Sequence, residues 1–282
     1  MNDTIETIGS SILHHGKYND RIYLLNFQRH DFPGILDELG ELALEKQYSK
    51  IIAKVPSFAK DGFTKYGYSV EAFIPRFYNG IEDVFFMGNY LTESRRLNCD
   101  HEKIRKILNT ASARYVEGRG AQLPDGFCYK ICDCSDIHKI AEVYRSVFET
   151  YPFPIHDPEY IRKTMDENFI YFSVRKNNKI IALASSEMDI VSQNVEMTDF
   201  ATLPEYQGYG FGLYLLQKME DEMQKRNIIT AYTIARAFSC GINTIFAKMG
   251  YMYSGTLLNN TNISGRLESM NVWYKFMRNT IN

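Results

Sequence analysis

Apolar positions in the first third of the chain alternate between strand-like and helical spacing. Residues 32–47 place apolar side chains on one helical face, which predicts a helix with Asp31 as its N-cap. Asn79-Gly80 is typical of a tight turn between two strands, and residues 101–114 predict a connecting helix. Strands are expected at residues 22–27, 49–55, 69–78 and 83–91.

The same alternation continues toward the C-terminus and predicts an α/β fold with a mixed sheet. Residues 211–226 give the clearest helical pattern, with apolar residues four apart. Ser135 and Asp157-Pro158 are expected to begin two earlier helices, the first ending near residue 149, and residues 240–248 predict another. Strands are expected at residues 127–131, 169–175, 179–189, 195–203 and 228–235, with a final hairpin over 251–277.

Residues 118–126 hold three glycines and a proline, which predicts a linker. It would divide the chain into an N-terminal domain, 1–117, and a second domain, 127–282. Phe63-Thr-Lys-Tyr-Gly-Tyr68 matches Phe246-Ala-Lys-Met-Gly-Tyr251, and each copy follows a strand and precedes a hairpin. The first domain is therefore expected to be a divergent copy of part of the second, with chance similarity as the alternative. It has no glycine-rich loop, so no cofactor is expected there.

Composition sets limits on the function. The 282 residues are 45% apolar and 23% charged, and the net charge of -2 calls for no nucleic acid or membrane partner. The N-terminal residues lack a signal-peptide pattern, and five cysteines without framework spacing fit a reducing compartment, so a cytoplasmic protein is expected. The spacing of Cys128, Cys132 and Cys134 matches no common zinc pattern, so no metal is expected. His14-His15 is expected at the surface.

The segment over residues 198–212 carries the chemistry. A strand enters a tight loop, and the loop opens a long helix. Gly208, Gly210 and Gly212 allow backbone N–H groups to approach a ligand, and the helix N-terminus adds partial positive charge. This predicts a site for a pyrophosphate. The spacing is GxGxG, so the loop is neither a Rossmann GxGxxG nor a Walker loop.

This run resembles the coenzyme A signature of the GNAT acyltransferase superfamily, Arg/Gln-x-x-Gly-x-Gly/Ala, through Gln207, Gly210 and Gly212. Asn243 and Gly250-Tyr251 resemble a later motif of that family. The resemblance covers about residues 127–277. It implies a GNAT fold there, preceded by a half-GNAT-like α/β domain, and acetyl-CoA as co-substrate. Cofactor contacts are implied for Phe200, Ala201, Thr202, Gln207, Gly208, Tyr209, Gly210, Phe211, Gly212, Asn243 and Phe246.

Over nearly the full chain, words such as Met-Thr-Asp-Phe-Ala-Thr and Glu-Ser-Met-Asn-Val-Trp-Tyr resemble β-lysine N6-acetyltransferases. That resemblance implies transfer of acetyl to the N6 amine of β-lysine, giving a compatible solute used in osmoadaptation. Two other functions remain open, namely acetylation of another small amine or a peptide, and non-catalytic sensing of acyl-CoA.

Attack on a thioester requires a neutral amine, whereas only about one lysine-type ammonium in 10³ is neutral at pH 7. The site must therefore remove a proton or desolvate the ammonium. Glu196 is in register with the usual general base of the family. Asp199 is its rival as base or as a binder of the ammonium, with a structural carboxylate as the alternative.

The backbone of residues 200–202 is expected to pair with the pantetheine amides, and one N–H to polarise the thioester carbonyl. Phe246 stands where the family usually has a tyrosine acid. Either Tyr251, Tyr253 or Tyr232 replaces it, or the thiolate leaves without an acid.

Substrate contacts are expected from aromatic, acidic and basic side chains around the acceptor. Tyr151 and Phe153 lie in a loop that would cover it, and Glu187 and Asp189 would face a cationic substrate. Arg236 is a candidate partner for a substrate carboxylate. The sequence allows a monomer or a homodimer.

Overall fold

The computed structural model describes residues 3–97, 100–113 and 120–277. Its N-terminal half contains six strands and four helices among these residues. The strands are β1 Thr4–Ile8, β2 Ser11–Gly16, β3 Arg21–Asn26, β4 Lys50–Pro56, β5 Ser69–Tyr78 and β6 Glu82–Tyr90. The helices are α1 Ile35–Lys46, α2 Lys60–Lys65, α3 Glu93–Arg96 and α4 His101–Ser112.

The C-terminal half contains the remaining elements of the described chain. Its strands are β7 Cys128–Ile131, β8 Phe169–Lys176, β9 Lys179–Asp189, β10 Asn194–Thr202, β11 Thr230–Arg236, β12 Met252–Ile263 and β13 Arg266–Phe276. Its helices are α5 Ile137–Val147, α6 Pro158–Asp166, α7 Phe211–Lys225 and α8 Cys240–Lys248. The expected helix over residues 240–248 and the expected strands over 69–78 and 179–189 have these bounds, so those three predictions are confirmed.

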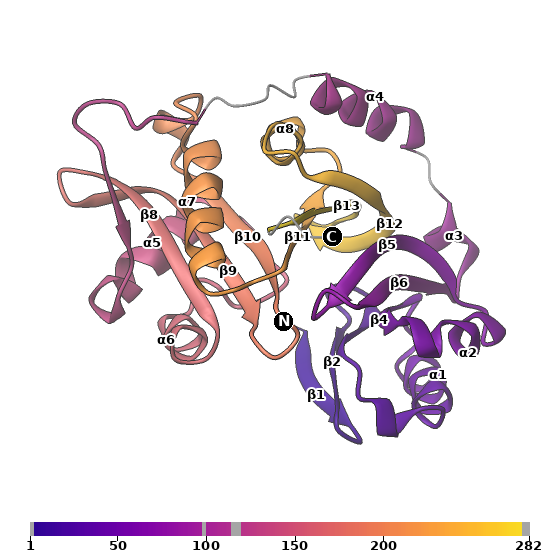
Figure 1. Cartoon of the computed structure of the whole chain (residues 1–282). Helices are drawn as coiled ribbons and strands as arrows, with labels where there is room; N and C mark the ends of the chain where they lie inside the picture. Colours follow the sequence, from indigo (N-terminus) through magenta and orange to yellow (C-terminus); the bar gives the residue numbers. More distant parts are fainter. Residues whose placement is uncertain (1–2, 98–99, 114–119, 278–282) are drawn as a thin grey trace.

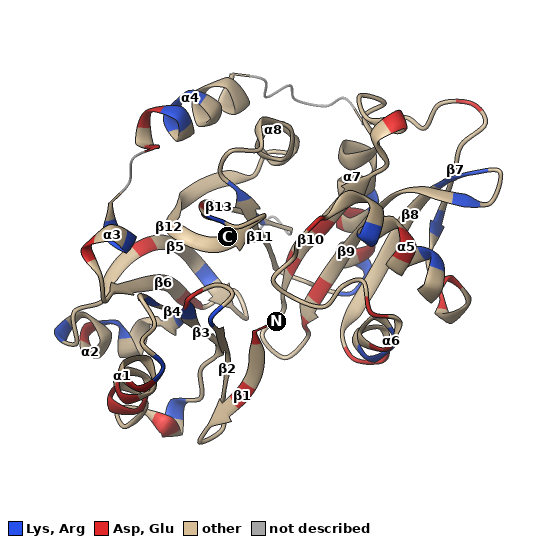
Figure 2. Ribbon diagram, turned by 180° about the vertical axis from the view of Figure 1, so that it is seen from behind, with Lys and Arg blue, Asp and Glu red and all other residues tan. Residues whose placement is uncertain are grey.

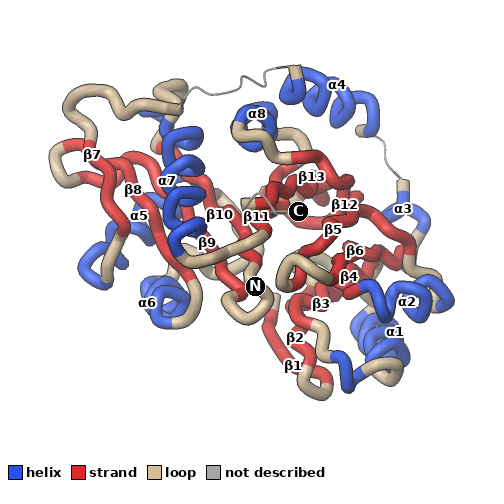
Figure 3. Tube along the Cα trace, viewed as in Figure 1, coloured by secondary structure: helices blue, strands red, loops and turns tan. Residues whose placement is uncertain are grey.

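The strands of both halves join in one mixed sheet across the described residues (Figures 1 and 3). Its order is β1-β2-β3-β4-β6-β5-β12-β13-β11-β10-β9-β8-β7. The halves meet where β5 pairs with β12, at Ala72 opposite Gly255. A Cβ on Gly255 would lie 2.0 Å from the Glu71 carbonyl oxygen, so the close approach of these strands requires glycine there.

Three hydrophobic clusters stabilise this arrangement. One lies in each half, where α1 packs on β3 and β4, and where α5 and α7 pack on β9 and β10. The third contains Tyr23 of β3 and Ile52 of β4 together with Tyr232 of β11 and Val272 of β13. Because β3 and β11 are not neighbours in the sheet, the sheet must curl so that the two halves face each other across this cluster.

The two halves repeat one order of elements. In the C-terminal half β10 pairs with β11 in parallel, β11 pairs with β13, and β12 and β13 form a hairpin. In the N-terminal half β3 pairs with β4 in parallel, β4 pairs with β6, and β5 and β6 form a hairpin. Phe63 and Phe246 lie in the short helices α2 and α8 that precede the hairpins. The predicted boundary at residues 117 and 118 lies outside the described residues.

Several sequence predictions need correction. His14 and His15 are 1% and 5% exposed because β2, which the sequence analysis missed together with β1, lies inside the sheet. Asp31 does not cap α1, whose N-cap is Gly34. Asp31 instead accepts hydrogen bonds from Ser10 N at 3.0 Å and Ser11 Oγ at 2.6 Å, both from the β1–β2 turn.

Of two other predicted helix starts, one is wrong and one is confirmed. The cap before α5 is Asp133, which accepts a hydrogen bond from Ser135 N at 2.9 Å and begins a 3-10 turn, so Ser135 is not the cap. Asp157 caps α6 as predicted, accepting from Glu159 N at 3.0 Å. In the part of the chain that the structure describes, no helix has the length and apolar character required to cross a membrane.

Candidate active site

The glycine-rich loop leads from β10 into α7, as the sequence predicted. Gly208 and Gly210 have φ angles of 88° and 79°, a region that side chains with a Cβ avoid, and a Cβ at either would meet nothing within 4 Å. Tyr214 N is the helical donor that bonds back to the Gly210 carbonyl, at 3.1 Å. The N–H groups of residues 211–213 precede this bond, so they stand at an open helix N-terminus suited to a phosphate.

Other predicted cofactor residues have a packing role. A Cβ on Gly212 would lie 2.7 Å from Ile245 Cδ1, so this glycine allows α7 to approach α8 closely. Phe246 is fully buried, with its ring centroid 5.6 Å from that of Phe200. Tyr209 is 53% exposed and its ring stacks on Phe211 at 5.5 Å, beside the loop.

Asn243 is buried and its amide is fully used within the chain. Its Nδ2 donates to the carbonyl oxygens of Arg236 and Ser239, at 3.0 and 2.7 Å. Its Oδ1 accepts from Asn271 Nδ2 and Trp273 Nε1, each at 2.9 Å. The side chain therefore ties the start of α8 to β11 and β13.

β10 and β11 separate beside this loop. They are paired at three positions only, the last being Glu196 opposite Tyr232. Beyond it, the pairing of β10 with β9 is irregular between Thr198 and Ala201, where Asp199 has a φ of 56°. Such a bulge bends a strand. Residues 200–202 thus present backbone groups on a strand edge that β11 no longer covers.

A row of polar side chains crosses the sheet where the strands separate. Glu187 of β9, Glu196 of β10 and Tyr232 of β11 are register partners and share one face. The pKa of Glu196 is raised to about 8, first by burial and then by the charge of Glu187, and Lys54 and the Tyr232 hydroxyl partly oppose this rise. The surrounding protein also raises the pKa of Glu187, although that side chain is exposed. Figure 2 shows acidic residues in red on β9 and β10.

The N-terminal half supplies the opposite wall of this site. Lys54 of β4 places its Nζ 5.9 Å from the centre of the Tyr232 ring. Tyr23 of β3 is 6% exposed, and its pKa is raised well above the usual value by burial and then by the charge of Glu196. Neither residue could be found from the sequence, because nothing in their spacing indicates a contact with β10, which begins 140 or more residues further along the chain.

Asp199 lies in a pocket of hydroxyl groups. It accepts hydrogen bonds from Tyr151 Oη and, at 2.5 Å, from Ser185 Oγ. Burial raises its pKa, and the hydrogen bonds from Ser185, Tyr151 and Thr198 oppose that rise. The contact with Tyr151 brings the loop before α6 onto the bulge of β10.

Phe153 of the same loop reaches the N-terminal half. Its ring centroid lies 4.5 Å from that of His14 on β2. A pocket of about 430 Å³ opens beside this contact and is lined by Tyr18, Tyr151 and Phe153 among others. The loop therefore closes one side of the site, between the two halves.

The remaining predicted residues are engaged elsewhere. Arg236 donates two hydrogen bonds to Glu268, at 3.0 and 2.8 Å. Asp189 accepts from Ser192 N at 2.9 Å in the β9–β10 turn. Tyr251 is 4% exposed, and burial together with nearby Glu220 raises its pKa well above the usual value. It therefore keeps its proton at neutral pH.

The chain is similar in sequence to known proteins of one family. Residues 137–244 match the acetyltransferase (GNAT) family. The chain is 42% identical to a β-lysine N(6)-acetyltransferase of Methanococcus maripaludis over 97% of this chain and 98% of that protein. It is 33% identical to a β-lysine N(6)-acetyltransferase of Methanosarcina mazei over 88% of this chain and 100% of that protein.

Among solved structures, the ribosomal-protein-S18-alanine N-acetyltransferase of Escherichia coli is 17% identical and aligns with a TM-score of 0.48 over 55% of this chain and 99% of that one. The family match and the near full-length relatives confirm the expected enzyme class and fold of the C-terminal half. The GNAT fold implies acetyl-CoA as the acyl donor. The chain belongs to the GNAT family of N-acetyltransferases.

Proposed function

We propose that this enzyme acetylates the N6 amine of β-lysine to give the compatible solute N6-acetyl-β-lysine. The observation that carries the substrate assignment is the 42% identity to a β-lysine N(6)-acetyltransferase across 97% of the chain. The similarity includes the N-terminal half, which supplies Tyr23 and Lys54 to the site. A relative that was similar only in the GNAT half would not indicate whether the part of the site formed by the N-terminal half is also shared.

Glu196 is proposed as the general base. It lies at the point where β10 and β11 separate, next to the uncovered edge of residues 200–202. Its pKa of about 8 suits a group that must take a proton from an ammonium near neutral pH. A cationic acceptor bound beside it would lower that pKa and favour the carboxylate form.

Asp199 is proposed to position the loop before α6, which carries Tyr151 and Phe153, rather than to exchange protons. Its carboxylate already accepts hydrogen bonds from Tyr151 and Ser185, so little of its hydrogen-bonding capacity remains for a substrate. Tyr151 and Phe153 would then cover the amine and exclude water. Glu187, in the same row as Glu196, would contribute negative charge that attracts a cationic acceptor.

The residues present fit acetyl-CoA. The open N–H groups of residues 211–213 and the positive-φ glycines Gly208 and Gly210 suit its pyrophosphate, and the uncovered edge of residues 200–202 suits its pantetheine amides. When bound, acetyl-CoA supplies the thioester that the amine attacks. Tyr251 and Tyr232 keep their protons at neutral pH, since burial raises both pKa values well above the usual range.

The test is a thiol-release assay with acetyl-CoA and a panel of amines: β-lysine, α-lysine, polyamines and a lysine peptide. We expect turnover of β-lysine well above that of α-lysine. Turnover of a different amine alone would retain the enzyme class and reject the osmolyte role. Binding of acetyl-CoA with no acetylation of any amine would favour a sensor instead.

A further inference from the structure

Arg21 of β3 is a buried cation with no carboxylate within ion-pair distance among the described residues, although the charges of Asp3 and Glu71 act on it from farther away. Four Lys or Arg residues among the described part of the chain are buried, and three of them meet a carboxylate within ion-pair distance. Arg21 is 3% exposed and makes no ion pair with any described residue. Because buried charges are normally paired, this exception calls for a partner from outside the chain. The three paired cations are Lys50 with Glu71 at 2.8 Å, Arg95 with Asp20 at 3.6 Å, and Arg175 with Asp136 at 2.7 Å.

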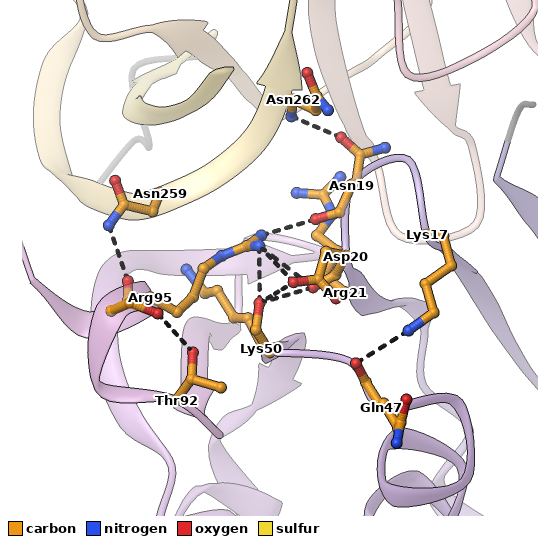
Figure 4. Close-up of polar contacts among 12 residues, drawn as sticks. Lys17, Asn19, Asp20, Arg21, Gln47, Lys50, Thr92, Arg95, Asn259 and Asn262 are labelled. Atoms are coloured by element: carbon orange, nitrogen blue, oxygen red, sulfur yellow. Dashed lines mark hydrogen bonds and ion pairs between the residues drawn. The ribbon is translucent and has the colours of Figure 1, made fainter. Parts of the chain in front are cut away.

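The contacts that Arg21 does make are neutral. Its Nη1 donates to the Asn260 carbonyl oxygen at 2.5 Å and to Thr261 Oγ1 at 3.3 Å, both in β12. Its Nε bonds to no described residue. These contacts fix the plane of the guanidinium without neutralising it. Figure 4 shows the contrast with Arg95 nearby, which is joined to both Asn19 and Asp20.

Arg21 lies two residues before Tyr23 on β3, and Tyr23 borders the proposed catalytic site. Alternate residues of a strand share a face, so Arg21 and Tyr23 lie side by side, and the guanidinium carbon is 5.2 Å from the centre of the Tyr23 ring. Tyr23 in turn lies in one hydrophobic cluster with Tyr232, the register partner of Glu196, and the charge of Glu196 raises the pKa of Tyr23. Tyr23 therefore stands between the proposed base and the unpaired guanidinium.

The spacing of Arg21 and Tyr23 on β3 is comparable to the length of a diamino acid. Residues two apart on a strand are about 7 Å apart, and an extended β-lysine, a zigzag of six bonds of about 1.5 Å, spans roughly 7–8 Å from its carboxyl carbon to N6. His14 borders the same space, because it is the register partner of Tyr23 and its Nδ1 bonds to no described residue. An acceptor with its amine at Glu196 would run past Tyr23, with its other end toward Arg21.

We propose that Arg21 binds the carboxylate of the acceptor and thereby selects an amino acid over a polyamine. The proposal rests on the proposed function of the same site. A guanidinium pairs with a carboxylate through two parallel hydrogen bonds, which fixes orientation as well as charge. A polyamine would bring a second ammonium toward a buried cation, which is unfavourable. Arg236, already held by Glu268, is left with a structural role.

The experiment measures kcat and KM for two substrate pairs that differ only in the carboxyl group. These pairs are β-lysine with pentane-1,4-diamine, and α-lysine with pentane-1,5-diamine. The wild-type enzyme is compared with R21Q, R21K and R236Q, and with R95Q as a second buried arginine. For R21Q we expect the KM of β-lysine to rise about 10- to 100-fold with little change in kcat, because a charged hydrogen-bonded pair is lost. The diamine should be unaffected, so the preference for the amino acid collapses.

Two results would overturn the proposal: R21Q lowering turnover of β-lysine and its diamine equally, or R236Q collapsing the preference instead. If R21Q does not fold, R21K decides, since it retains the charge but loses the paired geometry and should give an intermediate preference. R95Q should lower the melting temperature and leave the preference intact.

The same data separate this proposal from the proposed function. An Arg21-dependent preference for α-lysine over its diamine, together with no turnover of β-lysine, would reject β-lysine and retain Arg21. Turnover of β-lysine with a preference that R21Q leaves intact would reject Arg21 and retain the function. Turnover of no amino acid by the wild-type enzyme would reject both.

Discussion

The two halves of the chain use the same order of strands and helices, and they differ in the loop that follows the first parallel strand. This loop has eight residues in each half, 203–210 after β10 and 27–34 after β3. In the C-terminal half, Gly208 and Gly210 adopt positive φ and leave the helix N-terminus open. In the N-terminal half the single glycine, Gly34, has a φ of -54°, and Asp31 fills the loop with a carboxylate. An anionic ligand would be repelled there.

The two parallel strand pairs also differ in how far the first strand continues beyond its last paired residue. β10 continues for six residues beyond its last pair with β11, from 196 to 202, whereas β3 continues for only two beyond its last pair with β4, from 24 to 26. A long uncovered edge is what pantetheine amides require. The N-terminal half therefore lacks both features that the C-terminal half offers to a cofactor.

The N-terminal half nevertheless takes part in the candidate site of the C-terminal half. Its parallel strands β3 and β4 carry Tyr23 and Lys54 toward Glu196 and Tyr232, and the shared hydrophobic cluster fixes that orientation. Under the proposed function, one half would bind the donor, with the chemistry where its strands separate, while the other half would shape the acceptor side. The predictions below test that division.

The largest effect is expected at Glu196. E196Q removes the proposed base without changing its shape, so kcat/KM should fall by about 100-fold or more. In the wild-type enzyme kcat/KM should rise with pH through about 8, because the carboxylate accepts the proton and the pKa of the free enzyme is raised to that value. Initial rates between pH 6 and 9.5 check both statements.

E196Q should also lose the rise near pH 8, leaving only the titration of the amine. Its stability gives a second check. The folded pKa of Glu196 is above its unfolded value, so ionisation above about pH 5 destabilises the wild-type protein progressively as pH rises to about 8. E196Q should therefore melt higher than wild type at pH 8.5 and equally at pH 4.5. An unchanged rate would remove Glu196 from the role of base.

The next largest effect is expected on acetyl-CoA binding, and it compares the loop before α7 with the loop before α1. G210V places a β-branched residue at a φ of 79° in front of the helix N-terminus, so the Kd of acetyl-CoA should rise about tenfold or more. G34A is the matched variant in the N-terminal half, where a Cβ would meet only the Asp31 carbonyl oxygen, at 3.6 Å. It should bind acetyl-CoA like wild type in a calorimetric titration. Equal weakening by both variants would contradict the division.

Asp31 should affect stability and not cofactor binding. D31A removes an acceptor for Ser10 N and Ser11 Oγ, so the free energy of unfolding should fall by about 1–3 kcal/mol. Urea unfolding at pH 7 measures this loss, and D31N, which keeps one acceptor oxygen, should lose less. A rise in the Kd of acetyl-CoA without a loss of stability would indicate that the first loop does contact the ligand.

The sequence predicted most of the regular elements because their periodicity is local. The helix at Cys240–Lys248 and the Asp157 cap of α6 depend on neighbouring residues only. Asp31 failed as a cap because its donors come from the β1–β2 turn, some 20 residues earlier. His14 and His15 were expected at the surface because a short polar strand inside a sheet has no distinctive pattern.

The residues of the candidate site also divide into those found from a local segment and those whose place depends on the overall fold. The glycine loop could be found from one continuous segment, and the resemblance of that segment to the GNAT family pointed to Glu196. Tyr23, Lys54 and Arg21 could not, because their roles arise from the curl that brings β3 and β4 to face β10 and β11. The repeat at residues 63–68 and 246–251 indicated a second copy, but not that the copy would form a wall of the site.

The smallest effect tests whether the N-terminal half tunes the chemistry of the other. Lys54 favours the carboxylate form of Glu196, since its positive charge lowers a pKa that burial and Glu187 raise. K54M keeps the length of the side chain and removes the charge, so the pKa of Glu196 should rise further. At pH 7 the fraction of carboxylate then falls, and kcat/KM should drop several-fold, recovering at pH 9 or above. Exposed Lys225, which pairs with Glu222 at 3.4 Å, gives the control variant K225M with an unchanged profile. If the K54M profile falls evenly at all pH values, the N-terminal half acts on the site through packing alone, and the electrostatic part of the division is wrong.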